Sequence, residues 1–203
     1  MVRGWLHSPD QASGDGLVLT HGAGGNCESP LLKAVAEAFA ETGFAVLRCD
    51  LPYRQQRPHG PPFPAQAAND REGLRRAVTA LRELAPGRIV LGGHSYGGRQ
   101  STILAAERPE IADALLLLSY PLHPPRKPEQ LRTAHFPNLP APALFVHGTR
   151  DPFGSIEEMR AALRAIPART KLVEAEGAAH ALSLDVVPVI LRETTRWLNA
   201  SNK

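Results

Sequence analysis

A single serine, Ser95, lies between two pairs of glycines in the run GGHSYGG at residues 92–98. The apolar run RIVL precedes this stretch and a helical pattern follows it, which predicts a sharp turn from a strand into a helix. Such a turn holds the hydroxyl exposed and fixed, and an adjacent base can then make it a nucleophile. Gly93 and Gly97 stand at the two positions where side chains would collide if strand and helix approach closely. The pattern therefore predicts nucleophilic catalysis by Ser95.

A nucleophilic serine needs a base, and the sequence offers eight histidines. His180, in EGAAHAL, follows the last expected strand and precedes the last expected helix, which places it at the same edge of the sheet as Ser95. His147 ends an apolar strand, where a packed or hydrogen-bonded histidine is typical, and His94 lies inside the serine turn itself. We therefore predict that His180 is the base.

The base in turn needs a carboxylate that orients it. Asp151, in HGTRDPFG, follows the expected strand at 143–148 and precedes Pro152, which restricts its backbone. The order Ser95, Asp151, His180 along the chain is one of the known orders for nucleophile, acid and base, so Asp151 is predicted to complete a triad. An ordinary turn aspartate is the alternative interpretation, and Asp50 is the second choice for the carboxylate.

The negative charge that develops on a reacting carbonyl needs N–H donors nearby. The first predicted donor is the N–H of Tyr96, which opens the helix after Ser95. The second is expected from the glycine-rich stretch THGAGGNCESP at residues 20–30, which joins a strand to a helix and brings its backbone close to a substrate. Ala23 is the predicted donor in this stretch, and Gly24 is the second choice.

These residues need a framework that brings them to one edge, and the hydrophobic pattern predicts it. Short aliphatic runs indicate buried strands at 16–21, 44–50, 88–93, 114–119 and 143–148, with a more ambiguous strand at 170–176. Apolar spacing and capping signals, such as Ser29 with Pro30 and Ser155 with Glu158, indicate helices at 30–42, 66–85, 96–108, 156–166 and 184–199. This alternation predicts an α/β fold in one domain over residues 1–203, with a mostly parallel sheet between two layers of helices.

Two proline-rich stretches, at 51–64 and 120–142, interrupt this alternation. Proline removes backbone donors and restricts the residue before it, so neither stretch is expected inside the sheet. Each follows a strand at the edge where open α/β sheets bind ligands, which makes these stretches either walls of a pocket or plain surface connections. Tyr53 and Arg54, in the first stretch, are the predicted substrate-binding residues, and their chemistry would favour an acidic or polar acyl group.

The composition narrows the class of protein. The 203 residues are 43% hydrophobic, which is typical of a globular chain, and the formal net charge is +3. The arginines are spread through helices and loops instead of forming a basic stripe with aromatic residues, so no nucleic-acid partner is expected. Two cysteines and a start without an apolar leader favour a cytoplasmic protein, and no apolar run is long enough to span a membrane. No metal site and no cofactor are predicted, and the oligomeric state is left open.

The motifs HGAGG, GGHSYGG, GTRDP and GAAH, in this order, resemble the α/β-hydrolase superfamily over nearly the whole chain. The short length, without a large cap domain, is similar to the dienelactone-hydrolase-like branch. The stretch at 51–64 together with GGHSYGGRQS resembles hydrolases related to testis-expressed and NSL-complex hydrolase-like proteins. The resemblance implies a three-layer α/β-hydrolase fold. Ser95 stands where dienelactone hydrolase has a cysteine, so that enzyme's substrate is not carried over.

The triad predicts a serine hydrolase, of the carboxylesterase or thioesterase type, that cleaves a small ester or thioester through an acyl-enzyme intermediate. Two alternatives keep the fold: a hydrolase-like interaction module without activity, and an acyltransferase or lyase reaction on the same triad. The third and least favoured is a nucleotide-binding protein. Gly22 and Gly24 follow a strand and Asp50 ends the next one, but Cys27 replaces the third glycine of that motif.

Overall fold

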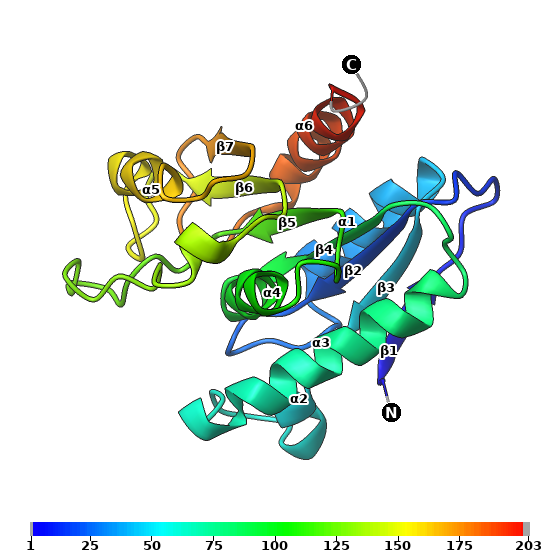
Figure 1. The fold of residues 1–203 in the computed structure, drawn as a ribbon, viewed down its shortest axis with the longest axis horizontal. Coiled ribbons are helices and arrows are strands. Elements are labelled where there is room, and N and C mark those ends of the chain that lie inside the picture. Colours follow the sequence, from blue (N-terminus) through cyan, green and yellow to red (C-terminus); the bar gives the residue numbers. More distant parts are fainter. Residues whose placement is uncertain (1, 201–203) are drawn as a thin grey trace.

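A seven-stranded sheet forms the centre of the chain in the computed structural model, which describes residues 2–200. The strands lie in the order β1-β3-β2-β4-β5-β6-β7, and all neighbouring pairs are parallel except β1 with β3 (Figure 1). The strands are β1 Gly4–His7, β2 Gly16–Thr20, β3 Ala45–Cys49, β4 Ile89–His94, β5 Ala114–Leu118, β6 Ala143–Gly148 and β7 Thr170–Ala175.

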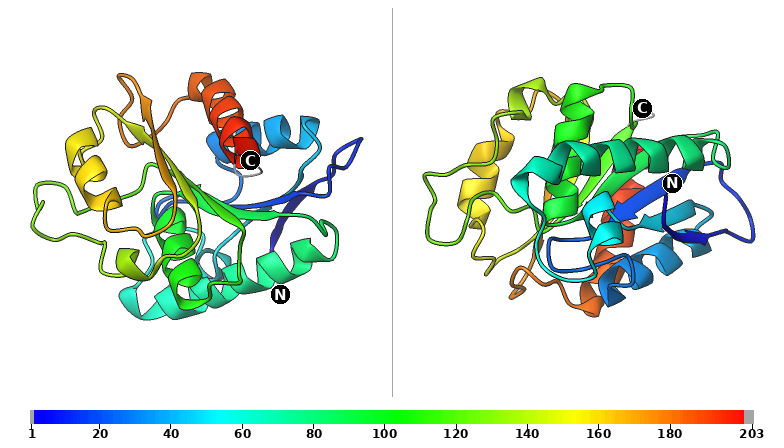
Figure 2. Two further views of the ribbon diagram at one scale, coloured as in Figure 1. Left: turned by 45° about the horizontal axis from the view of Figure 1, so that its top comes forward. Right: turned by 90° about the horizontal axis from the view of Figure 1, so that it is seen from below.

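Helices cover both faces of this sheet, as Figure 2 shows on its left side, where the sheet lies between the two helical layers. One layer holds α1 (Pro30–Glu41) and α6 (Val187–Asn199), and the other holds α3 (Ala67–Arg82), α4 (Tyr96–Glu107) and α5 (Ile156–Leu163). Shorter elements are α2 (Pro52–Gln56) and three 3-10 turns at Pro64–Gln66, Phe136–Asn138 and Leu184–Val186. The predicted three-layer α/β-hydrolase fold without a large cap is therefore confirmed.

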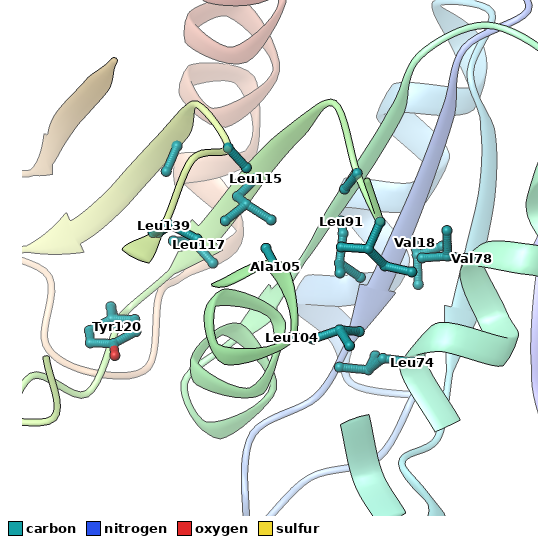
Figure 3. Close-up of a cluster of buried hydrophobic side chains, with 14 of the residues drawn as sticks. Val18, Leu74, Val78, Leu91, Leu104, Ala105, Leu115, Leu117, Tyr120 and Leu139 are labelled. Atoms are coloured by element: carbon teal, nitrogen blue, oxygen red, sulfur yellow. The ribbon is translucent and has the colours of Figure 1, made fainter. Parts of the chain in front are cut away.

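The central strands are buried on both faces, which explains their nearly continuous aliphatic sequences. Successive residues of a strand point to opposite faces, so Val18 and Leu91 pack beneath α3 and α4, as Figure 3 shows, while Leu17 and Val90 pack beneath α1 and α6. All of β2 and β5 is buried. The two apolar clusters fix the sheet rigidly between the layers, and with it the loops that leave the carboxyl ends of its strands.

The predicted strands and helices agree with the structure to within a few residues, with two additions. Strand β1 was not predicted because its four residues, GWLH, are mostly exposed and lack an alternating apolar pattern. It forms the edge of the sheet and pairs antiparallel with β3. Helix α2 lies within the proline-rich stretch at 51–64 and begins at Pro52, a residue that is well tolerated in a first helical turn.

The capping signals had different outcomes. Ser155 and Glu158 form the expected capping box at the start of α5, with Glu158 N–H donating to the Ser155 hydroxyl over 3.2 Å. Ser29 precedes α1 as predicted, but its side chain makes no capping hydrogen bond. The second proline-rich stretch, 120–142, runs mainly as loop with one 3-10 turn and projects from the sheet at the left of Figure 1. None of the helices described for residues 2–200 has the length and apolarity needed to cross a bilayer.

Candidate active site

Ser95 occupies a strained turn between β4 and α4, as the glycine pattern predicted. Its φ of 52° and ψ of −115° lie in a region that residues other than glycine seldom adopt. The Ser95 N–H donates to the Leu118 carbonyl at the end of β5 over 2.8 Å, which ties the turn to the neighbouring strand. Strain of this kind persists only where the surroundings hold it, and it is typical of functional positions.

Two of the glycines around Ser95, Gly93 and Gly97, make room for the end of β2. A Cβ atom on Gly97 would lie 2.5 Å from Thr20 Cγ2 and 2.6 Å from the His21 carbonyl oxygen, and one on Gly93 would overlap the Thr20 carbonyl oxygen. The sequence had suggested a collision between the strand and helix on either side of the serine. At these two positions the tightest contacts instead come from the end of a third element, strand β2, which no local pattern could identify.

Ser95, His180 and Asp151 lie in a hydrogen-bonded row. His180 Nε2 is 2.8 Å from Ser95 Oγ, and His180 Nδ1 is 2.8 Å from Asp151 Oδ2. A carboxylate only accepts hydrogen bonds, so Nδ1 carries the proton and Nε2 of the neutral ring accepts from the serine hydroxyl. The structure thus brings together the three side chains that the sequence selected from distant positions.

Asp151 and His180 are held by backbone and ring contacts. The Phe153 N–H donates to Asp151 Oδ1 over 2.9 Å, and the carboxylate side chain is fully buried. The Phe153 ring lies against the His180 ring with centroids 4.1 Å apart at 34°. His94 Nε2 lies 3.0 Å from the His180 carbonyl oxygen, so His94 donates to the loop that carries His180. These contacts restrict the imidazole to one orientation.

Two other histidines beside the site are buried and serve the backbone. His147 Nε2 donates to the Gly154 carbonyl over 2.8 Å, in agreement with its predicted structural role. His21 Nδ1 donates to the Gly22 carbonyl over 2.8 Å, and its Nε2 accepts the Leu51 N–H over 3.1 Å. Burial lowers the pKa of both histidines, which favours their neutral forms. Neither histidine is bonded to Ser95.

The stretch after β2 faces the serine and contains both predicted donors, Ala23 and Gly24. The carbonyl of Gly22 accepts from Gly25 N–H over 3.1 Å, and the carbonyl of Ala23 accepts from the Tyr53 hydroxyl over 2.9 Å. In a trans peptide, the C=O and N–H groups point in opposite directions. The N–H groups of Ala23 and Gly24 therefore point away from the groups that hold these carbonyls.

Tyr96 begins α4, and the N–H of a first helical residue has no partner within its helix. Its ring is fixed at the other end, because the Tyr96 hydroxyl donates to Asp70 Oδ2 over 2.9 Å. Ala23, Gly24 and Tyr96 all line one cavity with Ser95 and His180. The three predicted donors are thus close to the serine.

Tyr53 and Arg54, the predicted substrate-binding residues, do not line this cavity. Both are buried, with 0% and 3% of their surface exposed. The Arg54 guanidinium donates to the carbonyls of Ala23, Gly25, Arg57 and Gly60 over 2.7–3.1 Å. Four of the five N–H donors of this guanidinium are thus used by backbone carbonyls, so its position does not support a substrate contact. The structure places Tyr53 and Arg54 behind the stretch that contains Ala23, as its support.

Asp50, the second choice for the carboxylate, forms its hydrogen bonds with groups other than His180. Its Oδ2 accepts from the Arg3 guanidinium over 2.7 Å, and its Oδ1 accepts the Cys27 N–H over 2.8 Å. A nucleotide-binding protein would need this carboxylate to bind the ribose hydroxyl groups, but Arg3 and the Cys27 N–H already bind its two oxygens. Among residues 2–200 there is no group of three side chains suited to hold a metal ion.

The cavity in front of Ser95 has a volume of about 520 Å³. Its walls include His94, Phe153, Arg99, Pro121 and Arg132, none of which was predicted as a site residue. His94, Phe153 and Arg99 lie within four residues of the triad in the sequence, so adjacency was a usable signal. Pro121 and Arg132 belong to the stretch 120–142, which therefore does contribute to the pocket wall, but no local pattern distinguished these two residues.

Comparisons of the sequence with known proteins find relatives for part of the chain. A candidate carboxymethylenebutenolidase from Salmonella typhimurium is 33% identical over 109 residues, which are 50% of this chain and 39% of that protein. A candidate esterase/lipase from Haemophilus influenzae is 29% identical over 102 residues, which are 50% of this chain and 33% of that protein. The matches therefore span well under half the length of these curated relatives.

Solved structures share the fold over nearly the whole chain. A dienelactone hydrolase from Anabaena variabilis matches with a TM-score of 0.75 and 24% identity, covering 98% of this chain and 91% of that one. An α/β serine hydrolase without a lid from Xanthomonas campestris matches with a TM-score of 0.77 and 18% identity, covering 97% and 89%. The resemblance to the lidless branch is confirmed, whereas the similarity to testis-expressed and NSL-complex hydrolase-like proteins stays a prediction. The family model described as an alpha/beta hydrolase domain matches residues 13–187, and the chain belongs to that family.

Proposed function

We propose that this protein is a serine hydrolase that cleaves a small carboxylic ester or thioester through an acyl-enzyme. The observation that carries the proposal is the row of hydrogen bonds from Ser95 Oγ to His180 Nε2 and from His180 Nδ1 to Asp151, each 2.8 Å at its shortest. The names of its relatives, a candidate carboxymethylenebutenolidase and a candidate esterase/lipase, support ester cleavage as the reaction class.

The reaction begins when His180 Nε2 takes the proton of Ser95 Oγ as this oxygen attacks the carbonyl carbon. The carbonyl oxygen then bears the negative charge, and the N–H groups of Tyr96 and Ala23, or Gly24, donate to it. His180 passes the proton to the leaving alcohol or thiol as the bond to it breaks. Asp151 keeps the imidazole in the correct tautomer and stabilises its positive charge during the transfer.

Water completes the cycle by the same kind of steps, with water as the nucleophile and Ser95 as the leaving group. His180 takes a proton from water, the hydroxide attacks the acyl-enzyme carbonyl, and the acid leaves as Ser95 recovers its proton. In a serine protease the loss of one such N–H donor costs roughly 2.7–4 kcal/mol in the barrier. Support for Ala23 in this role comes from the carbonyls beside it, which face Tyr53 and Arg54 on the opposite side.

The strained backbone at Ser95 also supports the proposal. A φ of 52° with a ψ of −115° costs free energy at a serine, and a glycine would avoid that cost. The surrounding carbonyls and glycines fix this conformation, so the hydroxyl is held opposite His180 before any substrate binds. An interaction module without activity has no use for such strain combined with a hydrogen-bonded triad.

Labelling with a fluorophosphonate tests the proposal, because this probe phosphonylates only an activated serine. The purified protein should gain the mass of one label, and peptide mapping should place it on Ser95. Ser95→Ala and His180→Ala should not be labelled, whereas Ser183→Ala, which alters an exposed serine outside the cavity, should react like the wild type. Absence of labelling in a protein whose circular dichroism and melting indicate a native fold would contradict the proposal.

A further inference from the structure

Arg99 lies on the wall of the active-site cavity with a guanidinium that has no protein partner. Among residues 2–200, no hydrogen bond or ion pair involves the Arg99 side chain, and its buried Nε atom lacks an acceptor. Arg99 follows Ser95 by four residues in α4, one helical turn, so both residues lie on the same face of the helix. Long helical side chains also lean toward the helix N-terminus, which is the end that carries Ser95.

A second arginine, Arg132, lines the same cavity from the loop 120–142. Its backbone is fixed on both sides, because the Tyr120 hydroxyl donates to the Arg132 carbonyl over 2.7 Å and the Arg132 N–H donates to Leu122 over 2.8 Å. Its guanidinium makes one long contact, 3.4 Å, to the Pro121 carbonyl. Most of the donors of this side chain are therefore free for a ligand.

The positive charges of Arg99 and Arg132 repel each other, and among residues 2–200 neither guanidinium forms an ion pair with a carboxylate. Burial lowers the pKa of Arg132, and the positive charge of Arg99 lowers it further. None of the described residues that line the cavity is acidic. The neighbouring Arg71 is different, because Glu107 and Gln100 accept from its guanidinium over 2.9 and 3.2 Å. A positive field concentrated at one wall of a cavity attracts anions to it.

We propose that Arg99 and Arg132 bind an anionic oxygen group of the substrate, a carboxylate or a phosphate, while its ester carbonyl lies at Ser95. Guanidinium groups suit this role because their planar donors match the oxygens of either anion. The inference rests on the proposed esterase function and names its substrate class. The sequence pointed to Arg54 for such selectivity, but the carbonyls around Arg54 already use its donors.

The test compares two esters of equal chain length, 4-nitrophenyl hexanoate and the 4-nitrophenyl monoester of adipate, which ends in a carboxylate. Wild-type protein should favour the charged ester by about tenfold or more in kcat/KM. Arg99→Gln and Arg132→Gln should each lower kcat/KM for the charged ester by roughly 10- to 100-fold, as expected for a lost charged hydrogen bond. Most of this loss should be in KM, and the rate with the neutral ester should stay within about threefold.

Lys127→Gln is the matched control, because it removes one positive charge from the same loop at an exposed position outside the cavity. This variant should keep the wild-type ratio between the two esters. Inhibition of hexanoate hydrolysis by pentanoate and by butyl phosphate then tells which anion the arginines prefer. Both inhibitors should weaken in Arg99→Gln if they bind at this wall.

The outcomes separate this inference from the proposed function. Equal rates with both esters, in a wild-type protein that fluorophosphonate labels at Ser95, would overturn the anion site and leave the esterase proposal intact. A ratio that persists in both arginine variants would also overturn the anion site. Failure to hydrolyse either ester or to be labelled would instead overturn the esterase function, and with it the inference that depends on it.

Discussion

His94 Nε2 lies 3.0 Å from the main-chain carbonyl oxygen of His180, so the residue directly before the serine holds the loop that carries the base. The two rings are 5.3 Å apart, and burial lowers the pKa of His94, which favours the neutral form. The turn that positions Ser95 and the loop that positions His180 are thereby joined by a contact other than the hydrogen bond between the two side chains.

Replacement of His94 by alanine should lower kcat for a neutral nitrophenyl ester by roughly 2- to 10-fold, since a neutral hydrogen bond contributes about 0.5–1.5 kcal/mol. KM should change less than kcat, because the contact with the His180 carbonyl orients the imidazole. His94→Gln retains an N–H donor at a similar reach and should recover most of the rate. Equal kcat in His94→Ala and wild type, measured by initial rates, would show that the loop is held by other contacts.

Arg54 and Tyr53 support the stretch that presents Ala23 and Gly24. Arg54→Lys replaces a planar fork by a single ammonium, which cannot reach four carbonyls, so kcat should fall about tenfold or more. Tyr53→Phe removes the hydroxyl that donates to the Ala23 carbonyl and should have a smaller effect of the same kind. Steady-state kinetics with the neutral and the charged ester should report equal losses for both.

Arg57→Lys is the control for this pair, because the Arg57 guanidinium donates to the Pro61 carbonyl and lies over the Phe63 ring, and does not hold the Ala23 carbonyl. It should keep kcat near the wild-type value. A selective loss with the charged ester in Arg54→Lys would contradict the support role and return Arg54 to the substrate-binding residues that the sequence suggested.

Gly97→Ala should destabilise the fold, because the added methyl would lie 2.5 Å from Thr20 Cγ2 and 2.6 Å from the His21 carbonyl oxygen. Overpacking of this kind costs roughly 1–3 kcal/mol, which corresponds to several degrees in Tm for a chain of this size. Gly24→Ala is the contrast, since nothing lies within 4 Å of its added Cβ and its backbone does not adopt a positive φ. Thermal and urea unfolding of both variants should therefore separate them clearly.

His135 should make the fold sensitive to acid. Burial and the nearby Arg99 and Arg71 lower its pKa to about 4 in the folded chain, well below the ordinary histidine value of about 6.5. Between these two values the unfolded chain binds a proton that the folded chain does not. The stabilisation is therefore complete above pH 6.5 and is lost as the pH falls toward 4.

His135→Gln removes this titration while keeping an N–H that can reach the Thr102 hydroxyl, which lies 2.8 Å from His135 Nε2. Urea unfolding at pH 7 and pH 5 should show a smaller pH dependence in the variant, by at most about 1.4 kcal/mol per pH unit for one proton. An unchanged slope in His135→Gln would mean that other groups account for the acid sensitivity.

Much of the framework was predictable because its signals are local. Buried strands such as β5 read as unbroken aliphatic runs, and the caps of α5 lie in consecutive residues. Strand β1 was not predicted because its residues are mostly exposed and its position is set by hydrogen bonds to β3, which lies some forty residues away in the chain. Pairing across such a distance leaves no periodic trace in a four-residue segment.

The sequence by itself determined the order and type of most elements and pointed to Ser95, Asp151 and His180, because a sharp strand-to-helix turn, a strand-ending aspartate and a loop histidine each have local signatures. Only the tertiary structure decided which arginines face the cavity. The sequence does not distinguish Arg54 from Arg99. In the structure, the Arg54 guanidinium is surrounded by backbone carbonyls, whereas Arg99 lines the open cavity near a second cation, Arg132. The direction and the partners of a long side chain depend on residues that folding brings close to it. Because these residues are distant in the sequence, the local sequence around the side chain does not reveal them.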